Sequence, residues 1–117
     1  YISAMIAKKI AVVFFAGESG AEPDRAWLKS LDKADRIRVG EDIRTVEFGW
    51  PLGMPVCRPL GQGLYEVRTS LNNRIGRVLF GIVGGEMVLL HGFIKKSQTT
   101  PKDDLELARK RLKAYRS

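Results

Sequence analysis

Three short strand-like runs follow one another in the second half of the chain, and they constrain the fold more than any other feature. Residues 64–70, 76–83 and 87–95 are rich in β-branched and aromatic side chains and are separated only by turn residues. The first turn contains two asparagines and the second two glycines, which tolerate left-handed backbone geometry. We therefore predict an antiparallel meander, because such short turns cannot make the long crossover that parallel strands need.

The segments before the meander predict one strand and two helices. Residues 8–16, KKIAVVFFA, are predicted to form a central strand, because both faces of the run are apolar. Residues 17–49 carry apolar side chains at helical spacing, and Pro23 suits a first helical turn while Gly49 suits a helix end. Residues 50–63 are rich in proline and glycine, so we expect them to be irregular.

A last helix is predicted after the meander. Thr100 suits the N-cap, Pro101 the first position, and Asp103 stands where a capping box places an acid. The resulting prediction is an α+β fold with the order β-α-α-β-β-β-α. It consists of a small curled, mainly antiparallel sheet with an αα-hairpin packed on it and a C-terminal helix.

Composition bounds the domain organisation and the compartment. A chain of 117 residues with 44% hydrophobic residues predicts one domain, which we place at residues 5–117. Residues 1–4 are expected to be a non-native extension ahead of a natural start at Met5. Cys57 is the only cysteine, so no disulfide framework exists and a reducing, cytoplasmic location is expected. The apolar runs are too short to span a bilayer, so no membrane partner is expected.

The net charge of +7 is distributed unevenly. Residues 1–49 hold eight Lys/Arg and eight Asp/Glu, whereas residues 50–117 hold twelve Lys/Arg and five Asp/Glu. The whole excess therefore lies in the second half. One-sided positive charge favours a polyanionic partner such as nucleic acid, an acidic protein or an anionic membrane face. Simple solubilisation explains the charge equally well.

Strand alternation predicts which charged side chains share a face. In the first strand of the meander, Glu66 and Arg68 lie on one side, and Arg77 and His91 follow on the next two strands. A curled sheet would bring together Glu66, Arg68, Arg77 and one or both of Lys95 and Lys96, with Arg74 in the turn at the rim. Guanidinium and ammonium groups in such a cluster suit a phosphodiester, because they stabilise the extra negative charge of its transition state.

Each of these residues also has a simpler explanation. Glu66 and Arg68 can form an ordinary cross-strand ion pair, and Lys95 and Lys96 can solvate a strand end. His91, the only histidine, can be a hydrogen-bonded structural residue, and it excludes a two-histidine ribonuclease pair. Residues 109–111 can form a solvated helix face. The sequence contains no GxxxxGK[ST], HExxH or CxxC motif, and its carboxylates do not cluster outside the helical half, which disfavours metal-dependent hydrolysis.

Three segments resemble a known family. GLYEVR (residues 63–68), RVLF (77–80) and above all VLLHGFIKKSQTTP (88–101) are similar to the phage-derived, HigB-like branch of the RelE/ParE toxin superfamily. The resemblance extends from residue 8 to the end of the chain. It implies the RelE-like fold and a toxin of a type II toxin–antitoxin system.

The resemblance further implies an mRNA endoribonuclease that acts on ribosome-bound transcripts and inhibits translation. In such enzymes the 2′-hydroxyl of the RNA attacks the adjacent phosphate, so no metal or cofactor is expected. The implied catalytic residues are Arg68, Arg77, Lys95, Lys96 and Glu66, with Glu66 as the proton acceptor and His91 as a second candidate. Further RNA contacts are expected from Arg74, His91, Arg58, Lys102 and Arg109.

The expected partners are mRNA, the ribosome and a cognate antitoxin, which we predict to be a helix-turn-helix protein with an acidic surface. The chain departs from the family in lacking a tyrosine close behind the last strand; Tyr65 is expected in the core and Tyr115 lies far along the final helix. Two alternatives remain. One is a non-enzymatic ParE-like toxin that binds DNA gyrase, and the other is a basic RNA-binding domain without activity.

Overall fold

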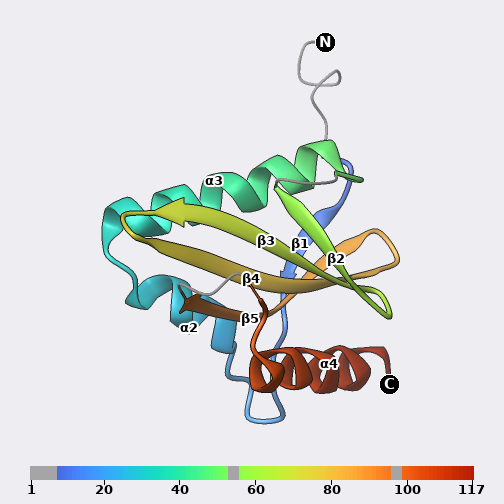
Figure 1. Cartoon of the computed structure of the whole chain (residues 1–117). Helices are drawn as coiled ribbons and strands as arrows, with labels where there is room; N and C mark the ends of the chain where they lie inside the picture. Colours follow the sequence, from blue (N-terminus) through green and yellow to red (C-terminus); the bar gives the residue numbers. More distant parts are fainter. Residues whose placement is uncertain (1–7, 53–55, 96–98) are drawn as a thin grey trace.

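The computed structural model describes residues 8–52, 56–95 and 99–117 (Figure 1). The elements follow the order β1 (Ala11–Phe14), α2 (Pro23–Ser30), α3 (Lys33–Gly49), β2 (Cys57–Gly61), β3 (Leu64–Leu71), β4 (Arg74–Val83), β5 (Glu86–Lys95) and α4 (Lys102–Arg116). The α+β prediction is confirmed, and the three strands of the meander lie within one or two residues of their predicted ends. In the described part of the chain, no helix is long and apolar enough to cross a membrane.

All five strands form one mixed sheet in the order β1-β5-β4-β3-β2. The three pairings among β2, β3, β4 and β5 are antiparallel, whereas β1 runs parallel to β5. Placing β1 in the centre of the sheet was therefore wrong. One face of this edge strand packs on the buried core through Val12 and Phe14, and the guanidinium of Arg25 lies 4.4 Å from the ring centre of Phe14. At the open edge of β1, Glu47 of α3 accepts a hydrogen bond from the amide of Val12 at 3.1 Å.

The second edge strand, β2, was missed. Residues 50–63 were expected to be irregular, yet Cys57–Gly61 pairs with β3 through a register shift between Pro59 and Gly61. Proline is tolerated there because one side of an edge strand needs no amide donor. The turn that follows has two residues with positive φ, Gln62 at 55° and Gly63 at 79°, a geometry that glycine adopts without strain.

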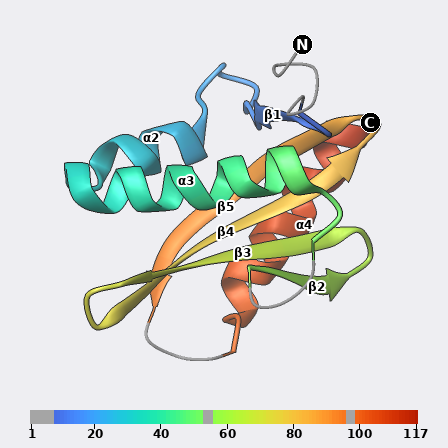
Figure 2. The same ribbon diagram turned by 90° about the horizontal axis from the view of Figure 1, so that it is seen from above.

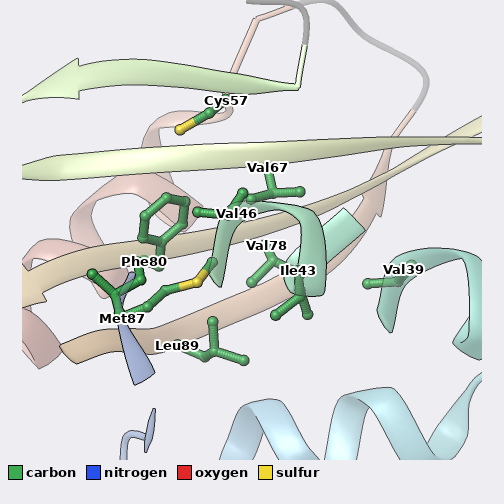
Figure 3. Close-up of a cluster of buried hydrophobic side chains, with 10 residues drawn as sticks. Val39, Ile43, Val46, Cys57, Val67, Val78, Phe80, Met87 and Leu89 are labelled. Atoms are coloured by element: carbon green, nitrogen blue, oxygen red, sulfur yellow. The ribbon is translucent and has the colours of Figure 1, made fainter. Parts of the chain in front are cut away.

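Helices cover the two faces of the sheet (Figures 1 and 2). The αα-hairpin of α2 and α3 packs on one face, as predicted, and α4 packs on the other. Side chains from α3 and alternate strand positions form the larger core cluster, drawn in Figure 3. The labelled members are Val39, Ile43, Val46, Cys57, Val67, Val78, Phe80, Met87 and Leu89. The smaller cluster joins Leu64, Leu79 and Leu90 to Ala108 and Leu112 of α4.

Two glycines let the helices approach the sheet closely. A Cβ at Gly81 would lie 2.5 Å from Leu112, and one at Gly92 would overlap the ring of Trp27. The start of α4 also differs from the prediction. Pro101 is the N-cap and Thr100 makes no capping bond, because its hydroxyl instead donates to Glu66 of β3. The predicted capping box is therefore wrong, and Thr100 joins α4 to the sheet.

Candidate functional site: an arginine–glutamate cluster on the α4 face

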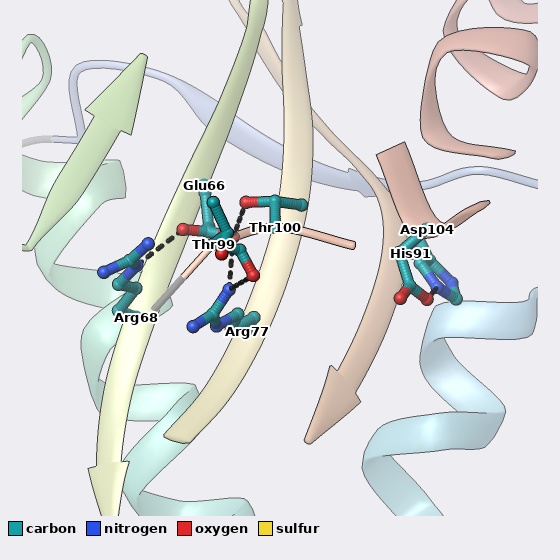
Figure 4. A network of polar contacts seen from close by, with 7 residues as sticks. All are labelled: Glu66, Arg68, Arg77, His91, Thr99, Thr100 and Asp104. Atoms are coloured by element: carbon teal, nitrogen blue, oxygen red, sulfur yellow. Dashed lines mark hydrogen bonds and ion pairs between the residues drawn. The ribbon is translucent and has the colours of Figure 1, made fainter. Parts of the chain in front are cut away.

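Glu66 is the centre of a polar cluster on the sheet face that α4 covers (Figure 4). Its side chain has no exposed surface and accepts a hydrogen bond from Arg68 Nε at 2.6 Å and another from Thr100 Oγ1 at 2.8 Å. Arg77 Nη1 lies 3.8 Å from the second carboxylate oxygen of Glu66. One buried carboxylate therefore joins two arginines from neighbouring strands to the segment that leads into α4.

The sequence explains why these side chains meet. Residues 66 and 68 share a face because strand side chains alternate, and β3–β4 pairing places Arg68 directly opposite Arg77. Two like charges opposite each other would destabilise the sheet. Glu66, two residues before Arg68 on the same face of β3, supplies the negative charge that offsets the repulsion between the two arginines. The predicted convergence of Glu66, Arg68 and Arg77 is thus confirmed.

Arg77 is the most buried cation of the cluster. Its side chain is 0% exposed, and Nη1 donates to the backbone carbonyl of Thr99 at 3.0 Å. Burial lowers the pKa of Arg77 below its ordinary value, while the charge of Glu66 opposes that effect. The positive charges of Arg68 and Arg58 lower the pKa further. In contrast, 15% of the Arg68 side chain reaches solvent, so Arg68 is the guanidinium of this pair that an external ligand can touch.

His91 lies on the same face but is paired outside the cluster. Its Nε2 lies 2.6 Å from Oδ1 of Asp104, in the first turn of α4, and its ring stacks on Phe93. Figure 4 shows this pair to the right of the Glu66 cluster. The two side chains of the pair are 18% and 19% exposed. Sequence reasoning did not identify Asp104; the only signal was an acid in a first helical turn, a position that helix dipoles favour in any case.

Two further predicted residues lie near the cluster. Arg58 of β2 stands opposite Glu66 in the strand register and is half-buried. Lys95 ends β5, opposite Ile75, and is exposed. Lys96 lies outside the described residues. Arg58, Arg68 and Lys95 are therefore three predicted cations with solvent-accessible surface that the fold places on or beside this face.

Three predicted RNA contacts are not brought into the cluster. Arg74 lies on the opposite face of the sheet, where Nη2 contacts Asp35 of α3 at 2.7 Å. Lys102 is an exposed residue whose Nζ lies 3.9 Å from Glu106 on the same helix. Arg109 donates to the side chain of Gln62 and to the carbonyl of Leu60 at 3.1 Å, so it holds α4 against β2 and the turn after it.

The tyrosines lie where the sequence suggested. Tyr65 packs in the core against Trp50 and Phe80, with ring centres 4.9 and 5.6 Å away. The hydroxyl of Tyr115 donates to Glu86 at 2.6 Å. That hydrogen bond, together with burial and the charge of Glu86, raises the pKa of Tyr115. Across residues 8–52, 56–95 and 99–117, no three His, Cys, Asp or Glu side chains gather as metal ligands would.

The arrangement suits binding of a phosphodiester at its accessible rim. Arg68 is oriented by a buried carboxylate, Arg58 stands opposite that carboxylate's residue on the neighbouring strand, and buried Arg77 adds positive charge. A guanidinium held in place binds phosphate oxygens with little loss of side-chain freedom. Glu66 itself has no exposed surface, so in this arrangement it positions the arginines. Its role as a proton acceptor stays a prediction and requires residues 99–101 to move.

Comparison with known proteins identifies the family. A comparison with curated proteins found no match. A family model described as "Phage derived protein Gp49-like (DUF891)" matches residues 26–113, which include the whole cluster. The chain therefore belongs to the phage-derived Gp49-like family, a toxin-type family within the RelE/HigB-like toxin superfamily.

Proposed function

We propose that this Gp49-like protein is the toxin of a type II toxin–antitoxin pair and has a RelE-like fold of the HigB branch. Its proposed activity is the cleavage of mRNA that the ribosome presents in the cytoplasm. One observation carries the proposal: a partly exposed arginine, Arg68, is oriented by buried Glu66 beside a second arginine on one sheet face. The membership of a toxin-type family supports it.

The proposed reaction is an internal transesterification of the RNA. The 2′-oxygen forms a bond to the adjacent phosphorus while the bond from phosphorus to the 5′-oxygen breaks, which leaves a 2′,3′-cyclic phosphate and a 5′-hydroxyl. One proton leaves the 2′-hydroxyl and one reaches the 5′-oxygen, so no water or redox partner is consumed. Arg68 and Arg58 stabilise the additional negative charge on the phosphate. Buried Arg77 stabilises the same charge electrostatically, without touching the RNA.

Exposure ranks the candidate proton acceptors. Glu66 is fully buried, whereas 18% of the His91 side chain is accessible. Asp104 beside the ring would stabilise the imidazolium that forms when His91 accepts a proton. Exposure therefore favours His91 over Glu66 as the acceptor, and we assign Glu66 the role of a positioning residue. Lys95, with its neighbour in sequence Lys96, is proposed to protonate the 5′-oxygen.

The chemistry predicts a specific test with modified RNA. A transcript with a single 2′-deoxy nucleotide at the cleaved step should stay intact, because the nucleophile is missing. Excess EDTA should leave the cleavage rate of a small RNA substrate unchanged. Cleavage of the 2′-deoxy transcript would overturn the proposed nucleophile, and loss of activity in EDTA would overturn the metal-independent reaction.

A second candidate function follows from the same burial. Because Glu66 forms an ion pair with Arg77 and accepts a hydrogen bond from Thr100, the cluster can also be explained as an internal brace that joins α4 to the sheet. The protein would then be a non-enzymatic toxin that binds DNA gyrase, or an RNA-binding domain without activity. Loss of gyrase supercoiling, with mRNA left intact, would identify the first of these.

The proposed antitoxin should carry acidic side chains on its contact surface, within a helix-turn-helix protein. The excess positive charge of residues 50–117 would attract such a surface and accelerate association. The affinity should fall as salt is raised from 0.1 M to about 1 M. An affinity that does not change over this range would exclude an electrostatically driven interface.

A further inference from the structure

A groove outside the Glu66 cluster lies between the β2–β3 turn and the C-terminal half of α4. It is lined by Gln62, Arg109, Leu112, Lys113, Arg116 and Ser117. In Figure 1 this part of α4 lies beneath the turn that joins β2 and β3. The groove is thus formed by two segments that are about fifty residues apart in the sequence.

Specific contacts fix the walls of the groove. Arg109 donates to the Gln62 side chain and to the carbonyl of Leu60, which ties α4 to the end of β2. The guanidinium of Arg116 lies against Gly63, where an added Cβ would be 2.7 Å from Nη2. Gly63 also has a φ of 79°. Glycine is therefore favoured at this turn by its backbone geometry, and the Arg116 guanidinium occupies the space beside it.

The charge along α4 is strongly divided. Its three acids all lie in its first five residues, at positions 103, 104 and 106, whereas residues 107–117 contain five cations and no acid. Cations near a helix C-terminus stabilise the helix dipole, which explains the composition of this half. The dipole does not explain why three of the five, Arg109, Lys113 and Arg116, line one groove. A groove lined by three cations and no acidic side chain suits a polyanion.

The position of the groove favours RNA over an acidic protein. Leu60, whose carbonyl binds Arg109, is two residues from Arg58, and Arg58 stands opposite Glu66. Gln62 follows Arg58 by four residue steps, which corresponds to about 13 Å of extended backbone. One continuous edge thus connects the cluster to the groove, as a polynucleotide backbone with phosphates at regular intervals requires.

We propose that this groove binds the phosphodiester backbone of the RNA strand some nucleotides away from the cleaved step. The inference rests on the proposed function in taking RNA as the substrate, but binding in the groove does not require cleavage. A strand that reaches both sites gains contacts with Lys113 and Arg116, whereas a short oligonucleotide that fills only the cluster does not. The protein should therefore bind long single strands more tightly than short ones, with a steeper dependence on salt.

The test measures binding without cleavage. Fluorescence anisotropy of labelled 2′-O-methyl RNA, which lacks the nucleophile, gives Kd for strands of 5 and 20 nucleotides (on the order of the footprints of small single-strand-binding domains). The variant Lys113→Ala/Arg116→Ala removes two cations of the groove. The matched control Lys29→Ala/Lys33→Ala removes two exposed lysines from α2 and α3, the helices on the other face of the sheet. Lys113→Ala alone provides a second groove variant, because Lys113 is exposed on the helix surface.

The groove variant should bind the long strand about fivefold more weakly, as expected for two exposed charge contacts, and should bind the short strand as the unmodified protein does. For the long strand, the plot of the logarithm of the association constant against the logarithm of the salt concentration should become shallower by about 1.4, since each phosphate contact contributes about 0.7 to its slope. The control should change neither value. Equal binding of the long strand by all variants would overturn the proposal, as would weakened binding of a polyglutamate peptide with unchanged RNA binding. If no variant and no unmodified protein cleaves RNA, but the long-strand effect is present, the groove stands and the proposed nuclease activity fails.

Discussion

The buried carboxyl group of Asp24 makes the stability of this protein depend on pH in an unusual direction. Asp24 is the second residue of α2, is 1% exposed, and neither of its carboxylate oxygens has a hydrogen-bond partner in the described part of the chain. It lies against Gly92 of β5, where an added Cβ would be 2.5 Å from Oδ1. Burial raises the pKa of Asp24 from 3.8 to about 7, although the positive charge of Arg111 opposes the rise.

The sign and size of the effect follow from linkage. Since the folded state favours the protonated acid, the full stability is present below pH 4 and is lost as the pH rises towards 7. The difference between 3.8 and about 7 corresponds to roughly 4 kcal/mol at about 1.4 kcal/mol per pH unit. This is a large fraction of the 5–15 kcal/mol that stabilises a typical small domain.

The perturbation is Asp24→Asn, which imitates the protonated acid at every pH. Urea denaturation of both proteins between pH 4 and pH 8 gives the free energy of unfolding at each pH. The two proteins should be similarly stable near pH 4, and the variant should be more stable by about 4 kcal/mol at pH 8. Asp103→Asn, an exposed acid at the start of α4, serves as the control and should follow the unmodified protein. Parallel stability curves for the unmodified protein and Asp24→Asn would refute the reasoning.

Three further predictions concern the cluster and the core. Glu66→Gln should lower the free energy of unfolding by about 3 kcal/mol in urea denaturation, because it leaves the buried charge of Arg77 without its carboxylate. The control Glu22→Gln, in an exposed pair, should cost less than about 1 kcal/mol. Gly92→Ala should destabilise the protein by about 2 kcal/mol or more in thermal melting, since its methyl group would overlap the Trp27 ring; unchanged melting would contradict this packing. Burial raises the pKa of the Cys57 thiol to about 11. Ellman's reagent should therefore label this thiol at pH 8 only when denaturant is added. Rapid labelling of the native protein would contradict the burial of Cys57.

The sequence predicted the face of the candidate site because that inference needs only strand alternation. Glu66 and Arg68 follow a period of two, and the short turns fix the register that places Arg77 opposite Arg68. The burial of the cluster could not be predicted. It depends on Thr100, which contacts Glu66 from 34 residues away, and local capping preferences had suggested a different role for that threonine.

The sheet edges were the least predictable part of the fold. An apolar run such as β1 is typical of a central strand, but here Val12 and Phe14 of an edge strand pack against the larger core cluster, and Glu47 of α3 accepts a hydrogen bond from the amide of Val12. The strand β2 carries the proline and glycine that usually indicate a loop, and the edge position is what tolerates them. Asp24 and Asp104 were missed for a related reason. Their surroundings are built by β5 and by helices far away in the sequence.

The central claim is that the rim of the Glu66 cluster cleaves RNA, and translating ribosomes with end-labelled mRNA test it most directly. The account predicts cuts within codons of bound mRNA that leave 2′,3′-cyclic phosphate ends. Arg68→Ala should abolish these cuts, whereas Lys29→Ala/Lys33→Ala should leave them unchanged. Intact mRNA in the presence of the folded, unmodified protein, or equal cleavage by Arg68→Ala, would contradict the claim.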